Sequence, residues 1–213
     1  MTQPTFILAS SSPRRRELLA SLGIAFRIVQ PAVDETLRPG EPPLDYARRL
    51  SREKALDVAA RLDEIAAVLA ADTVVILGAD TLGVDEQGDI LGKPADAGEA
   101  RAMLRRLRGR THQVCTALTL LQVDDAAAQP LTRITRTDVT MRAYTDDEIE
   151  AYIATGDPFD KAGAYAIQHP VFRPVAKIEG SYTNVVGLPL ETLREMLAEI
   201  GWPVITAPQE TSE

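Results

Sequence analysis

The segment "ILASSSPRRRELL", residues 7–19, joins an apolar run to a helical pattern through three serines and a proline. The apolar run at residues 7–9 is typical of a short strand. Ser12 is a favourable N-cap, Pro13 suits the first helical turn, and Gly23 indicates where the helix ends. A serine-rich turn that enters a helix presents backbone N–H groups and the positive end of the helix dipole. This combination favours an anion, phosphate in particular.

Arg14 and Arg15 follow directly in the first helical turn, where the helix dipole disfavours cations. The mismatch is resolved if an anion occupies the turn. The alternative is an ordinary capped helix whose arginines face water. The segment lacks the glycines and the Lys-Ser/Thr of a P-loop, so the motif itself does not establish a phosphate site. On spacing alone both interpretations stay open.

The remainder of the chain alternates between helix and strand patterns. From Leu44, apolar residues recur every three to four positions through Leu62, Ile65 and Leu69, which predicts one long helix that continues into Ala71. Strands are expected near residues 26–29, 73–77, 113–123 and 132–142, a hairpin turn at 84–89, and further helices near 97–108, 145–155 and 189–200. This alternation predicts an α/β protein with a mixed sheet.

Composition narrows the class of protein. The 213 residues carry a formal net charge of −8, which argues against a nucleic-acid partner because such proteins usually present a broad basic surface. The single cysteine, Cys115, cannot form an intrachain disulfide, which fits a reducing compartment. No apolar run approaches the length of a membrane span, and the first residues lack the pattern of a signal peptide. A cytoplasmic protein without a membrane partner is expected.

Other polar residues stand where phosphoryl chemistry would need them. Glu35 lies in a proline-rich loop, Lys54 on the long helix, and Lys93 in "ILGKP". The segment "GADT", residues 78–81, ends an apolar run, a position where α/β sheets place ligand groups. Each residue alone is more typical of a solvated charge. Together they supply carboxylates for Mg²⁺ or general-base catalysis and cations for phosphate.

Eight segments in order resemble the Maf family of nucleoside triphosphate pyrophosphatases over nearly the whole chain. They are "LASSSPRRRELL", "VDET", "REKA", "GADT", "ILGKP", "LRGRTHQV", "DKAGAYAIQ" and "GSYTNVVGLPL". The seventh is similar to the branch that acts on dTTP and UTP. The resemblance implies a mixed sheet with flanking helices and a cleft, similar to the inosine triphosphate pyrophosphatases. It also implies a single domain of two lobes at residues 1–205 and a homodimer. The last residues, 206–213 ("TAPQETSE"), are typical of a flexible tail.

The resemblance also assigns roles to individual residues. The phosphate-binding motif corresponds to Ser10, Ser12, Arg14 and Arg15, the lysines on the triphosphate to Lys54 and Lys93, and a metal ligand to Glu35. Gln168 corresponds to the residue that helps to select the base, together with Arg14 and the threonine after the catalytic aspartate. "IQHP" replaces the usual glycine after Gln168, so the rim of the base pocket is expected to differ.

The catalytic aspartate is ambiguous because "ADT" occurs twice, at Asp72 and at Asp80. The family pattern of strand, ADT, hairpin and Lys-Pro follows directly from Asp80, and Asp72 would then lie at a helix-to-strand junction. The separation from Lys54 instead favours Asp72. Because the order of strand, ADT, hairpin and Lys-Pro fits it directly, Asp80 is the preferred general base and metal ligand, with Thr81 as its base-selecting neighbour. Asp72 is the alternative.

The implied reaction is hydrolysis of dTTP or UTP to the monophosphate and pyrophosphate, with Mg²⁺ or Mn²⁺ as cofactor. An alternative is a nucleotide-binding regulator of cell division and septum formation without turnover. Intact aspartate, glutamate and lysine positions favour the enzyme. A third interpretation, a phosphatase acting on sugar phosphates, would release orthophosphate instead.

Overall fold

The computed structural model describes residues 4–78, 88–123 and 129–202. The tail expected at residues 206–213 lies outside this part of the chain, and the division of residues 1–205 into two lobes stays a prediction. The strands are β1 (Thr5–Ala9), β2 (Arg27–Ile28), β3 (Ala66–Leu77), β4 (Asp89–Leu91), β5 (Thr111–Val123), β6 (Leu131–Met141) and β7 (Val175–Glu179). The helices are α1 (Pro13–Ala20), α2 (Pro43–Ala59), α3 (Ala97–Leu107), α4 (Asp146–Ile153), α5 (Tyr182–Val186) and α6 (Leu190–Glu199), with 3₁₀ turns η1 (Asp157–Asp160) and η2 (Ala162–Ala164).

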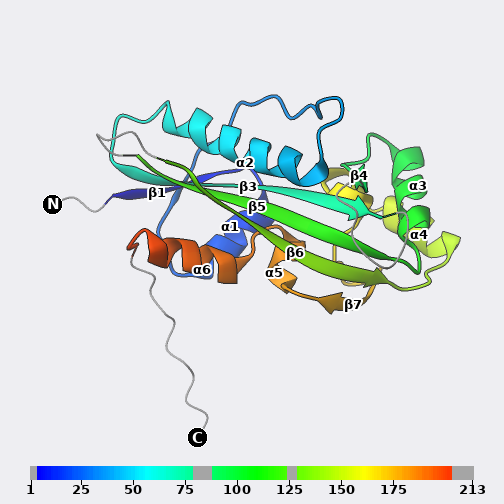
Figure 1. The fold of residues 1–213 in the computed structure, drawn as a ribbon. Coiled ribbons are helices and arrows are strands. Elements are labelled where there is room, and N and C mark those ends of the chain that lie inside the picture. Colours follow the sequence, from blue (N-terminus) through cyan, green and yellow to red (C-terminus); the bar gives the residue numbers. More distant parts are fainter. Residues whose placement is uncertain (1–3, 79–87, 124–128, 203–213) are drawn as a thin grey trace, which may run out of the picture.

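The strands form one mixed sheet in the order β2-β1-β3-β5-β6-β7, and β4 pairs separately with β3. β1 runs parallel to both β2 and β3, whereas β5, β6 and β7 continue the sheet in antiparallel pairs. Helix α2 covers one face of the sheet, and α1, α5 and α6 lie on the other (Figure 1). The fold class predicted from the sequence, a mixed α/β sheet with flanking helices, is confirmed.

Strand β3 is the centre of the molecule. Alternate side chains of a strand point to opposite faces, and both faces of β3 are covered by helices. Ala66, Val68 and Ala70 pack toward α2, whereas Ala67 and Leu69 pack toward α1 and α6. Burial on both faces explains why the strand is apolar along nearly its whole length.

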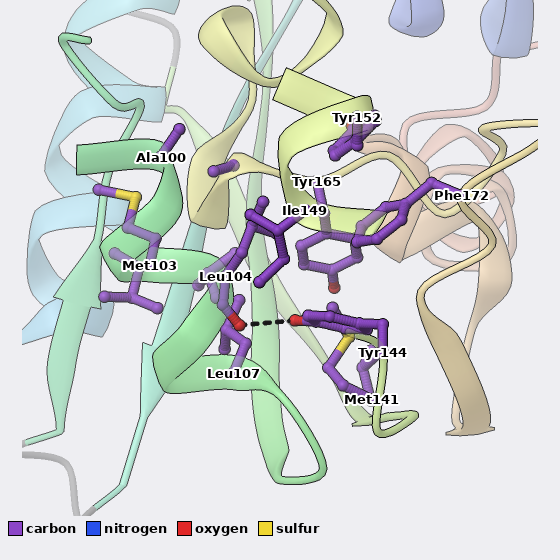
Figure 2. Packing of buried hydrophobic residues seen from close by; sticks show 14 of the residues in the cluster. Ala100, Met103, Leu104, Leu107, Met141, Tyr144, Ile149, Tyr152, Tyr165 and Phe172 are labelled. Carbon is purple, nitrogen blue, oxygen red and sulfur yellow. Dashed lines mark hydrogen bonds between the residues drawn. The ribbon is translucent and has the colours of Figure 1, made fainter. Parts of the chain in front are cut away.

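A second core lies at the far end of the sheet, where α3 and α4 pack on β3, β4 and β6 (Figure 2). Its aromatic side chains find their hydrogen-bond and stacking partners within the core. The hydroxyl of Tyr144 donates to the carbonyl of Leu104 at 2.7 Å, and the ring of Tyr152 stacks on Phe172 with centroids 4.4 Å apart. This core fixes β4 and η2, which are far apart in the sequence, against the central strand.

The expected long helix is wrong in its second half. Helix α2 ends at Ala59, and β3 already begins at Ala66. A strand buried on both faces has apolar residues at every position, so a helical spacing can be matched by chance in the same run. In consequence Asp72 lies in the middle of β3 and not at a helix-to-strand junction.

Candidate active site

The site lies along one edge of β3, where its partner strand changes. β1 pairs with β3 up to Ala70, and β4 pairs with it only from Val75. Among the described strands, none pairs with residues 71–74 on this edge. A cleft of about 670 Å³ lies at this interval, a volume in the range of small-molecule sites.

The start of α1 forms one wall of the cleft. Ser12 is the N-cap, and its hydroxyl accepts from the backbone N–H of Arg15 at 3.5 Å. The buried Ser10 hydroxyl accepts from the N–H of Ser12 at 3.2 Å. Within the described part of the chain, Arg14 makes one long ion pair, 3.4 Å to the carboxylate of Asp160, and its side chain is 28% exposed. Arg14 is therefore the arginine of this turn that is available to an incoming anion.

Arg15 is held differently. Its Nε donates to the carbonyl of Gly187 at 2.9 Å, and its Nη1 donates to the carbonyl of Ala71 at 2.8 Å. Nη1 also contacts Ser10 Oγ at 3.4 Å, and Nη2 donates to Thr73 Oγ1 at 3.1 Å. Four of the five N–H donors of the guanidinium are thus used inside the protein.

Two carboxylates meet at one lysine in the floor of the cleft. Lys54 Nζ lies 2.7 Å from Asp72 Oδ1 and 2.9 Å from Glu35 Oε1. Lys54 belongs to the buried stripe of α2, with Ala47, Leu50, Ala55 and Val58, and is only 6% exposed. It therefore points at β3, and Asp72 points at α2 because it lies on the α2 face of the strand.

The surroundings shift the acidity of both carboxylates. Burial raises the pKa of Asp72 from its ordinary value, and the charges of Lys54 and Arg15 only partly oppose this. Burial alone would also raise the pKa of Glu35. Its contact with Lys54 and the nearby charge of Lys93 outweigh burial and bring that pKa below the ordinary value. Asp72 is thus the stronger proton acceptor of the two.

The cleft continues into a smaller pocket of about 100 Å³. Thr73 and Lys93 line both spaces, and Gln168 lines the smaller one. The small pocket has apolar walls from Val75, Val114, Tyr165, Ile167, Val185 and Val186, and the charged residues Arg14, Arg15, Asp160 and Lys161 also line it. An extended polar ligand would thus find charged groups in both spaces, and in the smaller one also an apolar wall and the Gln168 amide.

The structure brings most of the predicted residues together. The cleft and its side pocket are lined by Ser10, Ser12, Arg14, Arg15, Glu35, Lys54, Lys93 and Gln168, and also by Asp72, the alternative aspartate. Asp80 and Thr81 lie outside the described residues. Lys93 has no ion pair among the described residues and is exposed.

Two cleft residues had no predicted role. Tyr46 lies on α2, and its hydroxyl donates to the backbone carbonyl of Glu35 at 2.8 Å. Burial raises the pKa of Tyr46 to about 12, so the hydroxyl keeps its proton and anchors the loop. Asp160 contacts Arg14 and also accepts from Lys161 at 2.6 Å. Asp160 is the first residue of "DKAGAYAIQ", a segment that resembles the family, and this position could have identified it as a cleft residue.

Comparisons with known proteins give a consistent result. The family model described as "Maf-like protein" matches residues 5–200. The dTTP/UTP pyrophosphatase of Anaeromyxobacter dehalogenans is 46% identical over 201 residues, which is 94% of this chain and 96% of that protein. The protein of the same description from Myxococcus xanthus is 48% identical over 202 residues, 95% of each chain.

A solved structure also aligns with this chain. The nucleoside-triphosphatase / dITP/XTP pyrophosphatase of Mycobacterium abscessus covers 66% of this chain and 75% of its own, with a TM-score of 0.40 and 16% identity. This likeness is too distant to support an argument.

Proposed function

The chain belongs to the Maf-like protein family, and on that premise we propose that it hydrolyses dTTP and UTP to the nucleoside monophosphate and pyrophosphate. The observation that supports this most strongly is the arrangement of Arg14, Lys54 and Lys93 around the paired carboxylates of Asp72 and Glu35. Cations placed before the substrate arrives stabilise a triphosphate and the charge that develops on the leaving pyrophosphate.

Asp72 is the proposed general base. Water attacks the α-phosphorus, its proton passes to the Asp72 carboxylate, and the bond from the α-phosphorus to the bridging oxygen breaks. The leaving pyrophosphate takes the bonding electrons. The raised pKa of Asp72 supports this role, since a base whose pKa is closer to neutrality accepts a proton more effectively. Arg14, Lys54 and Lys93 hold the negative oxygens.

The residues present fit a divalent metal. Asp72 and Glu35 each place an oxygen within 3 Å of the same Lys54 ammonium, at 2.7 and 2.9 Å, so their oxygens converge. The described residues contain no cluster of three or more His, Cys, Asp or Glu side chains that could hold a metal. Two carboxylates completed by substrate phosphates and water form the donor set that Mg²⁺ commonly uses. When bound there by Glu35 and Asp72, the metal would offset phosphate charge and lower the pKa of a water.

The side pocket supports a pyrimidine preference. Its volume of about 100 Å³ suits a single ring better than a fused double ring. Gln168 offers both an amide donor and a carbonyl acceptor, which matches the N3–H and O4 pattern shared by thymine and uracil. A cytoplasmic location and a homodimer stay predictions. None of the described helices is both long and apolar enough to span a bilayer.

Product analysis with two aspartate variants tests the proposal. The wild type should release pyrophosphate, not orthophosphate, from dTTP and UTP in the presence of Mg²⁺. Asp72→Asn should lower kcat by about 10² to 10⁴-fold, because it removes the proton acceptor and keeps the shape. Asp80→Asn is the matched control and should stay within a few-fold of wild type.

The outcomes separate the alternatives. An inactive Asp80→Asn with an active Asp72→Asn would assign the general base to the second ADT motif. Initial release of orthophosphate would refute the pyrophosphatase. Nucleotide binding without any turnover would instead support the regulator considered from the sequence.

A further inference from the structure

The geometry points to Arg15 as a positioning residue that holds the strand on both sides of Asp72, and not as a ligand of the triphosphate. This role rests on the proposed function. It differs from the expectation that Arg14 and Arg15 form one phosphate-binding pair.

Arg15 replaces a missing strand at the edge of β3. The ladder between β1 and β3 ends with Ala9 opposite Ala70. The next carbonyl, that of Ala71, accepts from Arg15 Nη1 at 2.8 Å. A buried carbonyl without a partner would cost free energy. The guanidinium therefore continues the hydrogen bonding of the sheet for one more residue.

The same guanidinium contacts the residue after Asp72. Its Nη2 donates to Thr73 Oγ1 at 3.1 Å, and that hydroxyl is also 2.9 Å from Thr116 Oγ1 on β5. The Asp72 and Thr73 side chains point to opposite faces of β3. Arg15 thus fixes the strand from one face, while Lys54 holds the Asp72 carboxylate on the other.

A third contact ties the strand to the wall of the side pocket. Arg15 Nε donates to the carbonyl of Gly187 at 2.9 Å, and Gly187 lines that pocket. Gly187 has φ +123°, and a Cβ there would lie 3.7 Å from Arg15 Nε and 3.9 Å from Thr73 Oγ1. The backbone conformation that presents this carbonyl is one that side-chain-bearing residues rarely adopt. Arg15 accordingly joins α1, β3 and the turn after α5.

The contrast with Arg14 is chemical as well as geometric. Among the described residues, Arg14 has one ion pair, a long one to Asp160, whereas Arg15 donates hydrogen bonds to three segments at once. Only a planar guanidinium can serve acceptors in several directions from one rigid group, and a lysine ammonium cannot reproduce this. A phosphate-binding role, by contrast, tolerates lysine as a point charge.

The test compares Arg15→Lys with Arg14→Ala, and uses two readouts. The first is the dissociation constant for the non-hydrolysable analogue α,β-methylene-dTTP with Mg²⁺, and the second is kcat and KM for dTTP. Arg15→Lys should bind the analogue within roughly three-fold of wild type and lower kcat by about 10- to 100-fold, because misplaced reacting groups slow chemistry without weakening binding. Arg14→Ala should weaken analogue binding by about 10-fold or more.

A gentler variant keeps the role testable if Arg15→Lys does not fold. Thr73→Val removes one acceptor of the guanidinium and keeps the β-branched shape that suits a strand. It should lower kcat, while Thr73→Ser, which retains the hydroxyl, should restore kcat. Analogue affinity is compared only between Arg15→Lys and Arg14→Ala, because Thr73 itself lines the side pocket. Thermal melting of every variant would separate loss of folded protein from loss of positioning.

Wild-type kcat in Arg15→Lys or in Thr73→Val would overturn the positioning role. So would a loss of analogue affinity in Arg15→Lys as large as that in Arg14→Ala. Either result, obtained with a wild type that releases pyrophosphate, leaves the proposed function standing. A wild type that releases no pyrophosphate from dTTP or UTP would refute the function itself and the role that rests on it.

Discussion

His112 should make the folded protein lose stability as the pH falls through the mildly acidic range. The side chain lies on β5, is 2% exposed, and contacts the Tyr165 hydroxyl through Nε2 at 2.8 Å. Among the described residues, its Nδ1 has no hydrogen-bond partner. Burial lowers the pKa of His112 from 6.5 to about 3.

The sign and size of the effect follow from proton linkage. Between a pH of about 6.5 and about 3, the unfolded chain binds a proton at His112 that the folded chain does not. The free energy of unfolding therefore falls as the pH falls, by about 1.4 kcal/mol for each pH unit. From pH 6.5 to pH 5 the loss amounts to about 2 kcal/mol, which corresponds to a fall in Tm of roughly 4–8 °C for a chain of this size.

The assay is urea denaturation and thermal melting of wild type and His112→Gln at several pH values between 5 and 7. Most carboxylates remain ionised over this interval, so the difference in slope between wild type and His112→Gln reports the titration of His112. Glutamine can still bond Tyr165 but does not titrate, and the slope of stability against pH should become flatter by the amount attributed to His112. Parallel curves for wild type and His112→Gln would refute the reasoning.

Two further predictions concern the floor of the cleft. Lys54→Met leaves the buried carboxylate of Asp72 without its partner and should lower the free energy of unfolding by about 3–5 kcal/mol in urea at pH 7. Lys177→Met, which breaks an exposed pair with Glu179, is the control and should change it by less than about 1 kcal/mol; equal effects would contradict the buried pair. Chelation with EDTA should stop pyrophosphate release from dTTP, and added Mg²⁺ or Mn²⁺ should restore it, whereas full turnover in EDTA would exclude the proposed metal.

Features that depend on a few neighbouring residues, such as helix caps and amphipathic helices and strands, could be predicted from the sequence. The turn at Ser12 is an N-cap as its residue type predicted, because capping depends only on neighbours within one helical turn. The capped start of α1 also lines the cleft, so the two interpretations of this segment are compatible. Strands and helices with ordinary amphipathic patterns, such as α3 and β6, lie close to their expected positions.

Long-range relations could not be read in the same way. The central strand was misassigned over residues 66–72 because full burial removes the periodicity on which the distinction between helix and strand depends. Strand β7 and helix α5 were not predicted; they are five residues long each and offer little pattern. The contact of Arg15 with Gly187 spans 172 residues of sequence, and no local rule anticipates it.

One signal was present and was not used. Lys54 occupies a position of the buried stripe of α2, between Leu50 and Val58. A lysine in such a stripe is seldom buried unless it is paired, so the position itself indicated a carboxylate on the facing strand. That carboxylate is Asp72, whose strand was interpreted as the end of a helix.

The interval on β3 between its pairing with β1 and its pairing with β4 has a mechanical consequence. β3 is 12 residues long, ~40 Å at the usual rise per residue, and it stays paired with β5 from Ala66 to Ile76, past the whole interval. The two walls of the cleft are therefore fastened to one continuous pair of strands, with no loop between them to serve as a hinge. A movement of β1 relative to β4 that narrowed the cleft would therefore have to twist or bend this ladder, because both strands pair with the same uninterrupted β3.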